Sequence, residues 1–265
     1  MQGRKDSNPR PSVLETDALT RLSYAPKADT KSYPPDPRHD ASRVPIAEAK
    51  RAAPQSRVPP ALVSGRMTAF IANVGVNCSH RVTSPLYGDG SFKLMPIPEA
   101  QPWAPPMVRL AKAWGDRAVH LDPDLEGEPR TYGDNCRRAP RAFALRQAKP
   151  RDTILFLARL TPASGDPGFY LVGELVIEDV IEDVTRDPGR GWWDGNAHVR
   201  RARATNRWDA FWVFKGSTSS GFYKRARPFN RKEADQLFGN WCWRESRTEL
   251  QTIGSYTRTI RRLPA

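Results

Sequence analysis

The stretch DTILFLARL (152–160) is followed after a short connection by GFYLVGELVIEDV (168–180), and these two runs decide the fold class. Both runs are apolar and rich in β-branched and aromatic residues, which indicates two strands. Because the connection between them is short, an antiparallel pair is favoured over a parallel one. Gly173 interrupts the second run, so we expect a β-bulge close to it.

Other strands and helices are predicted on both sides of this pair. Further strands are expected in MTAFIANVGVN (67–77), SFKLMPI (91–97), RAVHL (117–121) and DAFWVFKG (209–216). Helices are expected in PPMVRLAKAW (105–114), APRAFALRQA (139–148) and NRKEADQLFG (230–239). The last helix has the strongest signals, because Asn230 and Glu233 form a capping box and Gly239 can end the helix.

The strands outnumber the helices, and the two types are mixed along the chain. This order predicts an α+β fold, with a single domain around a mixed or barrel-like β-sheet and a few short helices. We expect that domain to span residues 67–265. Residues 1–66 hold ten of the 25 prolines and show no apolar periodicity, which predicts a disordered, basic, Pro-rich arm. The alternatives are a plain spacer and translation that begins at Met67.

The charge of the chain is strongly basic and uneven. The formal net charge is +13, and residues 196–265 contain 15 Lys and Arg against 5 Asp and Glu. Such a region is typical of a surface that faces phosphate groups, although general solubility charge explains it equally simply. No apolar run is long enough to span a membrane. The three scattered cysteines give no disulfide framework, so we expect a cytoplasmic protein with no membrane partner.

An acidic segment, HLDPDLEGEPRTYGD (120–134), stands out against this basic background. Its prolines and glycines predict an irregular loop, and loops commonly display functional groups. His120, Asp122 and Asp124 alternate, so in extended backbone the three side chains share one face. An imidazole with two carboxylates can bind a divalent cation or act as acid and base. The simpler interpretation is a solvated acidic loop.

Two basic segments are candidate binding sites. In GNAHVRRARATNR (195–207), His198 is a candidate general base beside Asn196, and Arg200 can grip phosphate; the alternative is a surface segment in which His198 is merely packed. In VFKGSTSSGFYKRARPF (213–229), a strand is expected to end at Lys215 before a loop of small residues. The groups in that loop that suit phosphate are Lys215, Gly216, Ser217, Ser220, Lys224 and Arg225. A flexible hairpin loop is the alternative.

Several motifs in collinear order resemble the nucleotide modification associated domain family, third type. They include NVGVN, SPLYGDGSFKLMPIPE, HLDPDL, TYGD, NAH and VFKGSTSS, and together they cover about residues 67–230. The family is associated with phage and bacterial systems that modify DNA bases, so the resemblance implies other proteins of such a system as partners. The matching positions are Asn73, Asn77, Asp89, Glu99, His120, Asp122, Asp124, Tyr132, Asp134, Asn196, His198, Lys215, Gly216 and Ser220.

We expect from these observations a protein that acts on a nucleotide or on nucleic acid, with DNA or a free nucleotide as its partner. The expected catalytic residues are His120, Asp122, Asp124, Asp134 and His198. The binding residues are expected to be Asn77, Asp89, Glu99, Tyr132, Asn196 and Arg200, together with the Lys215–Arg225 groups named above. The alternative is a non-catalytic reader of modified bases, because the two long strands also resemble those of base-reading barrel domains.

Overall fold

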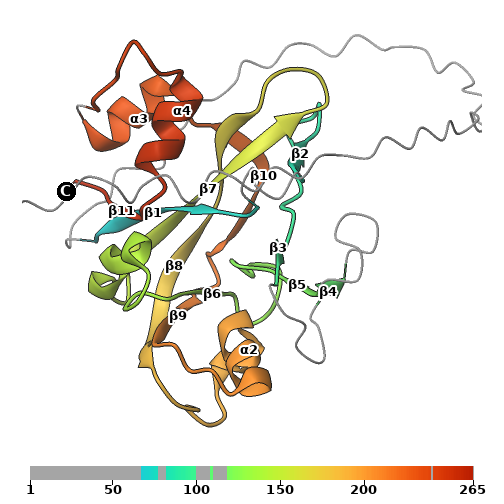
Figure 1. Ribbon diagram of the computed structural model, residues 1–265, viewed down its shortest axis with the longest axis vertical. Helices are drawn as coiled ribbons and strands as arrows, with labels where there is room; N and C mark the ends of the chain where they lie inside the picture. The colour runs from blue at the N-terminus through green and yellow to red at the C-terminus, as the bar shows by residue number, and fades with distance from the viewer. Residues whose placement is uncertain (1–66, 77–81, 100–107, 110–117, 240, 265) are drawn as a thin grey trace, which may run out of the picture. The chain divides into compact units, whose positions relative to one another are not determined.

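A computed structural model describes residues 67–76, 82–99, 108–109, 118–239 and 241–264 (Figure 1). The predicted disordered arm, residues 1–66, lies outside the described residues. The α+β prediction is confirmed, because the described chain forms an eight-stranded mixed sheet, a small three-stranded sheet and several short helices.

The large sheet has the order β11-β1-β7-β8-β9-β6, with β2 also paired to β7 and β10 also paired to β8. Its strands are β1 (Ala69–Val74), β2 (Ser84–Leu86), β6 (Thr131–Asp134), β7 (Thr153–Pro162), β8 (Gly168–Val184), β9 (Phe211–Gly216), β10 (Gly221–Pro228) and β11 (Arg261–Arg262). The small sheet has the order β3-β5-β4, from β3 (Ile97–Pro98), β5 (Ala118–His120) and β4 (Val108–Arg109).

The centre of the large sheet is the antiparallel pair β7–β8, as its sequence predicts. The register shifts where Phe156 faces Gly173 and Leu157 faces Leu171, so Val172 is an extra residue and the expected bulge is confirmed beside Gly173. On the other edge of β7, β1 and β2 follow one another and both run parallel to it. The sheet is therefore mixed, with parallel pairing on one side of β7 and antiparallel pairing on the other.

The outer edge of the long strand β8 is covered by two strands that run end to end. β10 pairs with β8 near Tyr170–Glu174, and β9 pairs with it from Ile177 to Val184, both antiparallel. Residues 217–220 therefore connect two strands that run in the same direction along β8, and they do not form a hairpin. A side chain at 173 would place its Cβ 2.7 Å from the backbone oxygen of Gly221, so Gly173 allows β10 to approach β8. The sequence had indicated a loop where β10 forms.

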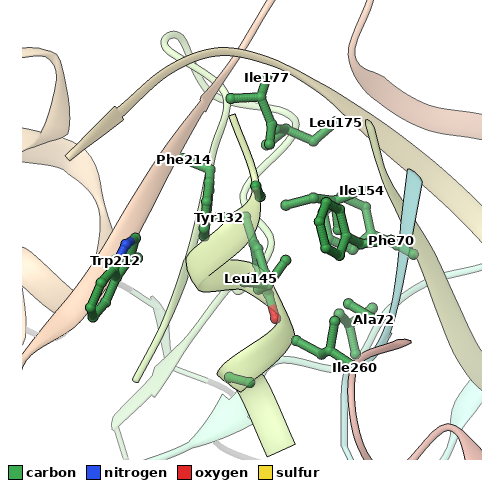
Figure 2. Packing of buried hydrophobic residues seen from close by; sticks show 14 of the residues in the cluster. Phe70, Ala72, Tyr132, Leu145, Ile154, Leu175, Ile177, Trp212, Phe214 and Ile260 are labelled. Carbon is green, nitrogen blue, oxygen red and sulfur yellow. The ribbon is translucent and has the colours of Figure 1, made fainter. Parts of the chain in front are cut away.

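The hydrophobic core between the sheet and η2 is the largest of three clusters of buried side chains. β7 contributes Ile154 and Phe156 to that core from one face, while Leu157 points to the other face, as a strand buried on both sides requires. Figure 2 shows Leu145 lying among side chains from strands on opposite sides of the core, including Tyr132 and Ile154. A second cluster packs α3 and α4 on the outer face of β1 and β7, and a third packs α2 on β9.

The helices are short, each of nine residues or fewer. They are η2 (Pro140–Gln147) and η3 (Trp192–Gly195), both of 3-10 type, and the α-helices α2 (Ala197–Thr205), α3 (Arg231–Phe238) and α4 (Glu249–Tyr256). Figure 1 shows α3 beside α4, and α2 next to β6. The α3 prediction is confirmed with its capping box, in which Asn230 accepts from the Lys232 N–H and Glu233 accepts from the Asn230 N–H.

Two predictions of local structure are wrong. Val108 and Arg109 form strand β4, where a helix over 105–114 was expected; the rest of that segment lies outside the described residues. The expected strand over 91–97 is mostly irregular, with a single bridge at Phe92 and β3 beginning only at Ile97. Pro96 and Pro98 remove two backbone donors from this segment, which limits its pairing.

Candidate functional site

A cavity of about 370 Å³ lies beside β10 and is the centre of the candidate site. It is lined by Gly75 after β1 and by three segments, 91–97 after β2, 121–126 after β5, and 222–224 of β10. Phe92 and Phe222 both line it and contact each other edge to face, with ring centroids 6.2 Å apart and an interplanar angle of 85°. We call this cavity the β10 cleft. Its aromatic and aliphatic lining suits the flat face of an organic ring.

Charged groups of both signs also line the β10 cleft. Asp122, Asp124 and Glu126 contribute carboxylates, and Lys93 and Lys224 contribute ammonium groups. The Asp122 side chain is only 9% exposed, whereas both lysines are exposed. Asp122 and Asp124 therefore lie on the inner wall of the cleft, and the two lysines lie at its rim together with Glu126.

The Asp122 carboxylate is held by two donors. Its Oδ1 accepts from the Gly133 backbone N–H at 3.0 Å, and its Oδ2 lies 3.1 Å from Nε2 of His198. Nδ1 of His198 lies 3.2 Å from Nη2 of Arg201. Because a guanidinium only donates, Nδ1 must accept, and the hydrogen-bond network therefore assigns the imidazole hydrogen to Nε2, which donates to Asp122. Arg201 in turn approaches Asp209, with Nη2 and Oδ2 3.7 Å apart.

The start of α2 positions His198 against β6. Asn196 is the N-cap, and its side-chain oxygen accepts from the His198 N–H at 3.0 Å while its Nδ2 donates to Oγ1 of Thr131 at 3.1 Å. Gly133 makes the close contact possible, because a Cβ there would lie 2.6 Å from Cδ2 of His198. The sequence segments around 133 and 198, which are far apart in the chain, therefore form one rigid unit.

Asp134 lies on the opposite face of β6 from this unit. Its side chain is 2% exposed; it accepts from the Tyr132 hydroxyl at 3.0 Å, from Nη2 of Arg141 at 2.8 Å and from the Asn135 N–H at 2.8 Å. Burial raises the pKa of Asp134, although the charge of Arg141 acts to lower it. Burial, and then the charge of Asp134, also raises the pKa of Tyr132 well above its usual range. This buried group joins β6 to η2 and does not line the β10 cleft.

The other members of the acidic segment are spread over several environments. His120 on β5 lies against Glu99, with Nδ1 and Oε1 2.7 Å apart in a contact that departs from hydrogen-bond geometry. Asp124 accepts from the Gly127 N–H at 3.1 Å and lines the cleft. Glu126 and Glu128 are exposed. The structure thus brings Asp122 and Asp124 to one cleft but does not bring His120 or Asp134 to it.

The expected phosphate-binding loop makes its hydrogen bonds within the protein. Nζ of Lys215 lies 2.6 Å from Oε1 of Glu178, and Oγ of Ser220 accepts from the Val176 N–H at 2.9 Å. The N–H groups of Gly216 and Ser217 donate to the carbonyl oxygens of Arg130 and Val176. These partners fix the turn between β9 and β10, so the loop is a structural junction in this conformation.

The remaining predicted binding residues fall into three groups. Lys224 and Arg225 are exposed on β10, and Arg200 lies half-buried on α2. Asp89 caps a surface turn, where hydrogen bonds from the Ser91 side chain and backbone lower its pKa. Asn77 lies outside the described residues.

Sequence reasoning missed part of the lining of the β10 cleft. Lys93 and Phe92 were treated as members of a strand, and no local pattern marks them as site residues. Arg201 was noted only as one arginine in a basic run, whereas its guanidinium orients His198. Its spacing of three residues from His198 on a helix was the available signal.

Neither a metal cluster nor a membrane span occurs in the part of the chain that the structure describes. No three His, Cys, Asp or Glu side chains there are arranged to hold a metal ion. No helix of the described ranges is long and apolar enough to cross a membrane.

Comparison with known proteins shows the family of the chain. No curated protein and no solved structure shows significant similarity to it. A family model described as nucleotide modification associated domain 3 matches residues 68–263, which include every residue of the β10 cleft and of the Asp122–His198 unit. The chain therefore belongs to the nucleotide modification associated domain 3 family, and so to the proteins associated with nucleotide modification systems.

Proposed function

We propose that this domain binds a nucleotide, or a base presented by nucleic acid, in the β10 cleft and acts on it by proton transfer at Asp122. One observation carries the proposal. Asp122 lines the cleft, and its carboxylate is held from behind by the Gly133 N–H and by His198. A carboxylate fixed at the wall of an aromatic cleft is well suited to act as an acid or base on a bound ring.

The proposal divides the roles among side chains of the cleft. Phe92 and Phe222 contact the base, since aromatic rings stack on any base. Lys93 and Lys224 at the rim attract the phosphate. His198 is a positioning residue rather than the general base, because both of its ring nitrogens already have partners.

Two sets of residues expected from the sequence have no part in this mechanism. Lys215 and Ser220 already bond to other protein groups, so the phosphate role passes to the rim lysines and to Arg225. Asp134 and His120 do not line the cleft, and we assign them to the support of the fold.

The experiment that tests the proposal is a nucleoside analysis. Host DNA and the nucleotide pool are digested and analysed by mass spectrometry from cells that carry the gene, that lack it, or that carry Asp122→Asn. We expect a nucleoside whose amount changes with the parent gene and not with Asp122→Asn. Glu128→Gln, an exposed residue of the same loop, is the matched control and should behave like the parent.

A second candidate function is that of a non-catalytic reader of modified bases. It is favoured by the hydrogen bonds that hold the Asp122–His198 unit in place, because a fixed carboxylate also suits a recognition wall. A reader leaves the nucleoside profile unchanged by the gene while the purified chain still binds nucleic acid through the β10 cleft. An unchanged profile without any binding of nucleotide or nucleic acid would contradict both candidates.

A further inference from the structure

The inner wall of the β10 cleft presents hydrogen-bond acceptors. Its charged side chains that are not exposed are those of Asp122 and Asp124, whose carboxylates accept but do not donate when ionised. In Asp124, Oδ1 accepts from the Gly127 N–H, while Oδ2 takes part in no hydrogen bond with the residues that the structure describes. A ligand that covers this wall must therefore bring a donor to Oδ2 of Asp124, or leave that acceptor unsatisfied.

The ammonium groups of the cleft lie elsewhere, at its exposed rim, which they share with the carboxylate of Glu126. Lys93 and Lys224 are exposed, while Asp122 is nearly buried. This order suits a molecule with an amino group at one end, a flat ring in the middle, and an anionic group at the other end. The edge-to-face pair Phe92–Phe222 contacts the middle part.

We infer that the cleft selects nucleotides whose base carries an exocyclic amino group, as cytosine and adenine do, over bases with a carbonyl group in its place. This inference rests on the proposed function, since it names the substrate class of the same site. The amino groups of cytosine and adenine are hydrogen-bond donors and can satisfy the carboxylates. Uracil and hypoxanthine present a carbonyl oxygen at that position, and its lone pairs face those of Asp124.

The expected ratio of Kd values follows from the hydrogen bond to Asp124 that an amino base makes and a carbonyl base cannot make. A hydrogen bond to a charged group contributes about 1.5–3 kcal/mol, which corresponds to a ratio of about 10-fold or more in Kd. A site built around such a bond rejects the analogue without the donor, because its own acceptors are then left unpaired.

Two matched pairs of ligands test the inference with the full chain by isothermal titration. The pairs are dCMP with dUMP and dAMP with dIMP, each also offered as a single-stranded homopolymer about twelve nucleotides long. We expect Kd to be at least about 10-fold lower for the amino member of both pairs. Equal affinities, or a preference for the carbonyl members, would overturn the inference while leaving nucleotide binding intact. If no monomer and no homopolymer binds, the proposed function fails, and the inference fails with it.

A variant assigns the selection to one side chain. Asp124→Asn keeps an oxygen that can accept from the Gly127 N–H, so the loop is expected to keep its conformation, but its amide now offers a donor to the ligand. The ratio within each pair should fall toward one. Glu128→Gln removes the same charge from an exposed position of the same loop and should keep the parent ratio. A ratio that Asp124→Asn leaves unchanged contradicts the role of Asp124 in selection.

Discussion

The carboxylate of Asp122 and the imidazole of His198 meet beside β6, with Oδ2 and Nε2 3.1 Å apart, although 76 positions separate the two residues in the chain. Both side chains are about nine-tenths buried. This contact links the wall of the β10 cleft to the start of α2. It also gives the imidazole a defined tautomer, because Arg201 donates to the opposite ring nitrogen.

A double-mutant cycle measures this contact. Asp122→Ala, His198→Ala and the double variant should show a coupling of about 0.5–3 kcal/mol in the free energy of unfolding, as expected for two polar groups in direct contact. Urea denaturation gives the four values. Simple additivity of the two single changes would show that the contact has no energetic weight.

Gly133→Ala should destabilise the protein by about 1–3 kcal/mol, because the new Cβ would lie 2.6 Å from the His198 ring and 3.1 Å from Oδ1 of Asn196. The ring must then move, and with it the partner of Asp122. Gly195→Ala is the control, because a Cβ at 195 meets no atom within 4 Å. Equal midpoints of urea unfolding for the two variants would be inconsistent with tight packing of α2 on β6.

The pH dependence of stability should report the buried Asp134. Its pKa in the folded protein is raised above the ordinary value of 3.8, mainly by burial, so the folded protein retains a proton that the unfolded chain has released. The contribution of Asp134 to the free energy of unfolding should therefore fall as pH rises from about 4 through the raised pKa. Subtracting the free energies of Asp134→Asn from those of the parent, over a pH series, isolates this contribution.

Asp187 provides a control of opposite sign. It is exposed, and hydrogen bonds from Arg203 are the main cause of its lowered pKa. A lowered pKa gives stability that is present at higher pH and is lost as pH falls through the folded value. The same subtraction for Asp187→Asn should therefore slope the other way. Slopes of the same sign for the two aspartates would contradict the assignment of burial as the main cause of the raised pKa of Asp134.

Nucleic-acid binding should depend on the exposed basic residues of β10. Replacing Lys224, Arg225 and Arg227 by Ala should flatten the plot of log affinity against log salt concentration by about 1–2 units, because fewer counterions are released. Fluorescence anisotropy with a labelled single strand at several salt concentrations gives the slope. The matched control replaces three exposed arginines near α4, Arg244, Arg247 and Arg258. An equal effect of both triple variants would indicate general charge rather than a defined surface.

The parts of the fold that were predictable from the sequence are those with a local signal. The pair β7–β8 has long apolar runs, and α3 has a capping box. Strand β10 was missed because none of its eight residues is buried and three of them are basic, so it lacks the apolar pattern of a buried strand. Helix α2 was missed for a similar reason, although Asn196 and the buried positions Ala197, Val199 and Ala202 carry a helical signal among its arginines.

The candidate site was only partly predictable, since its parts come together through tertiary structure. Asp122 and His198 were each identified as candidates, but no local pattern shows that they touch. Asp134 was grouped with Asp122, yet it alternates with Gly133 along β6 and so points to the opposite face. The face of the sheet to which Asp134 points can be known only once β6 and its pairing with β9 are known.

The connection between β7 and β8, residues 163–167, offers a place to divide the chain into two pieces. Residues 163–166 are exposed, and Gly165 has open space around it. The first piece would carry the cleft segments 91–97 and 121–126, and the second would carry 222–224 together with His198. Neither piece alone encloses the cleft. During synthesis the cleft can form only after Lys224 has left the ribosome. Ligand binding would thus report the reunion of two separately expressed halves, which makes this domain a natural scaffold for a split sensor.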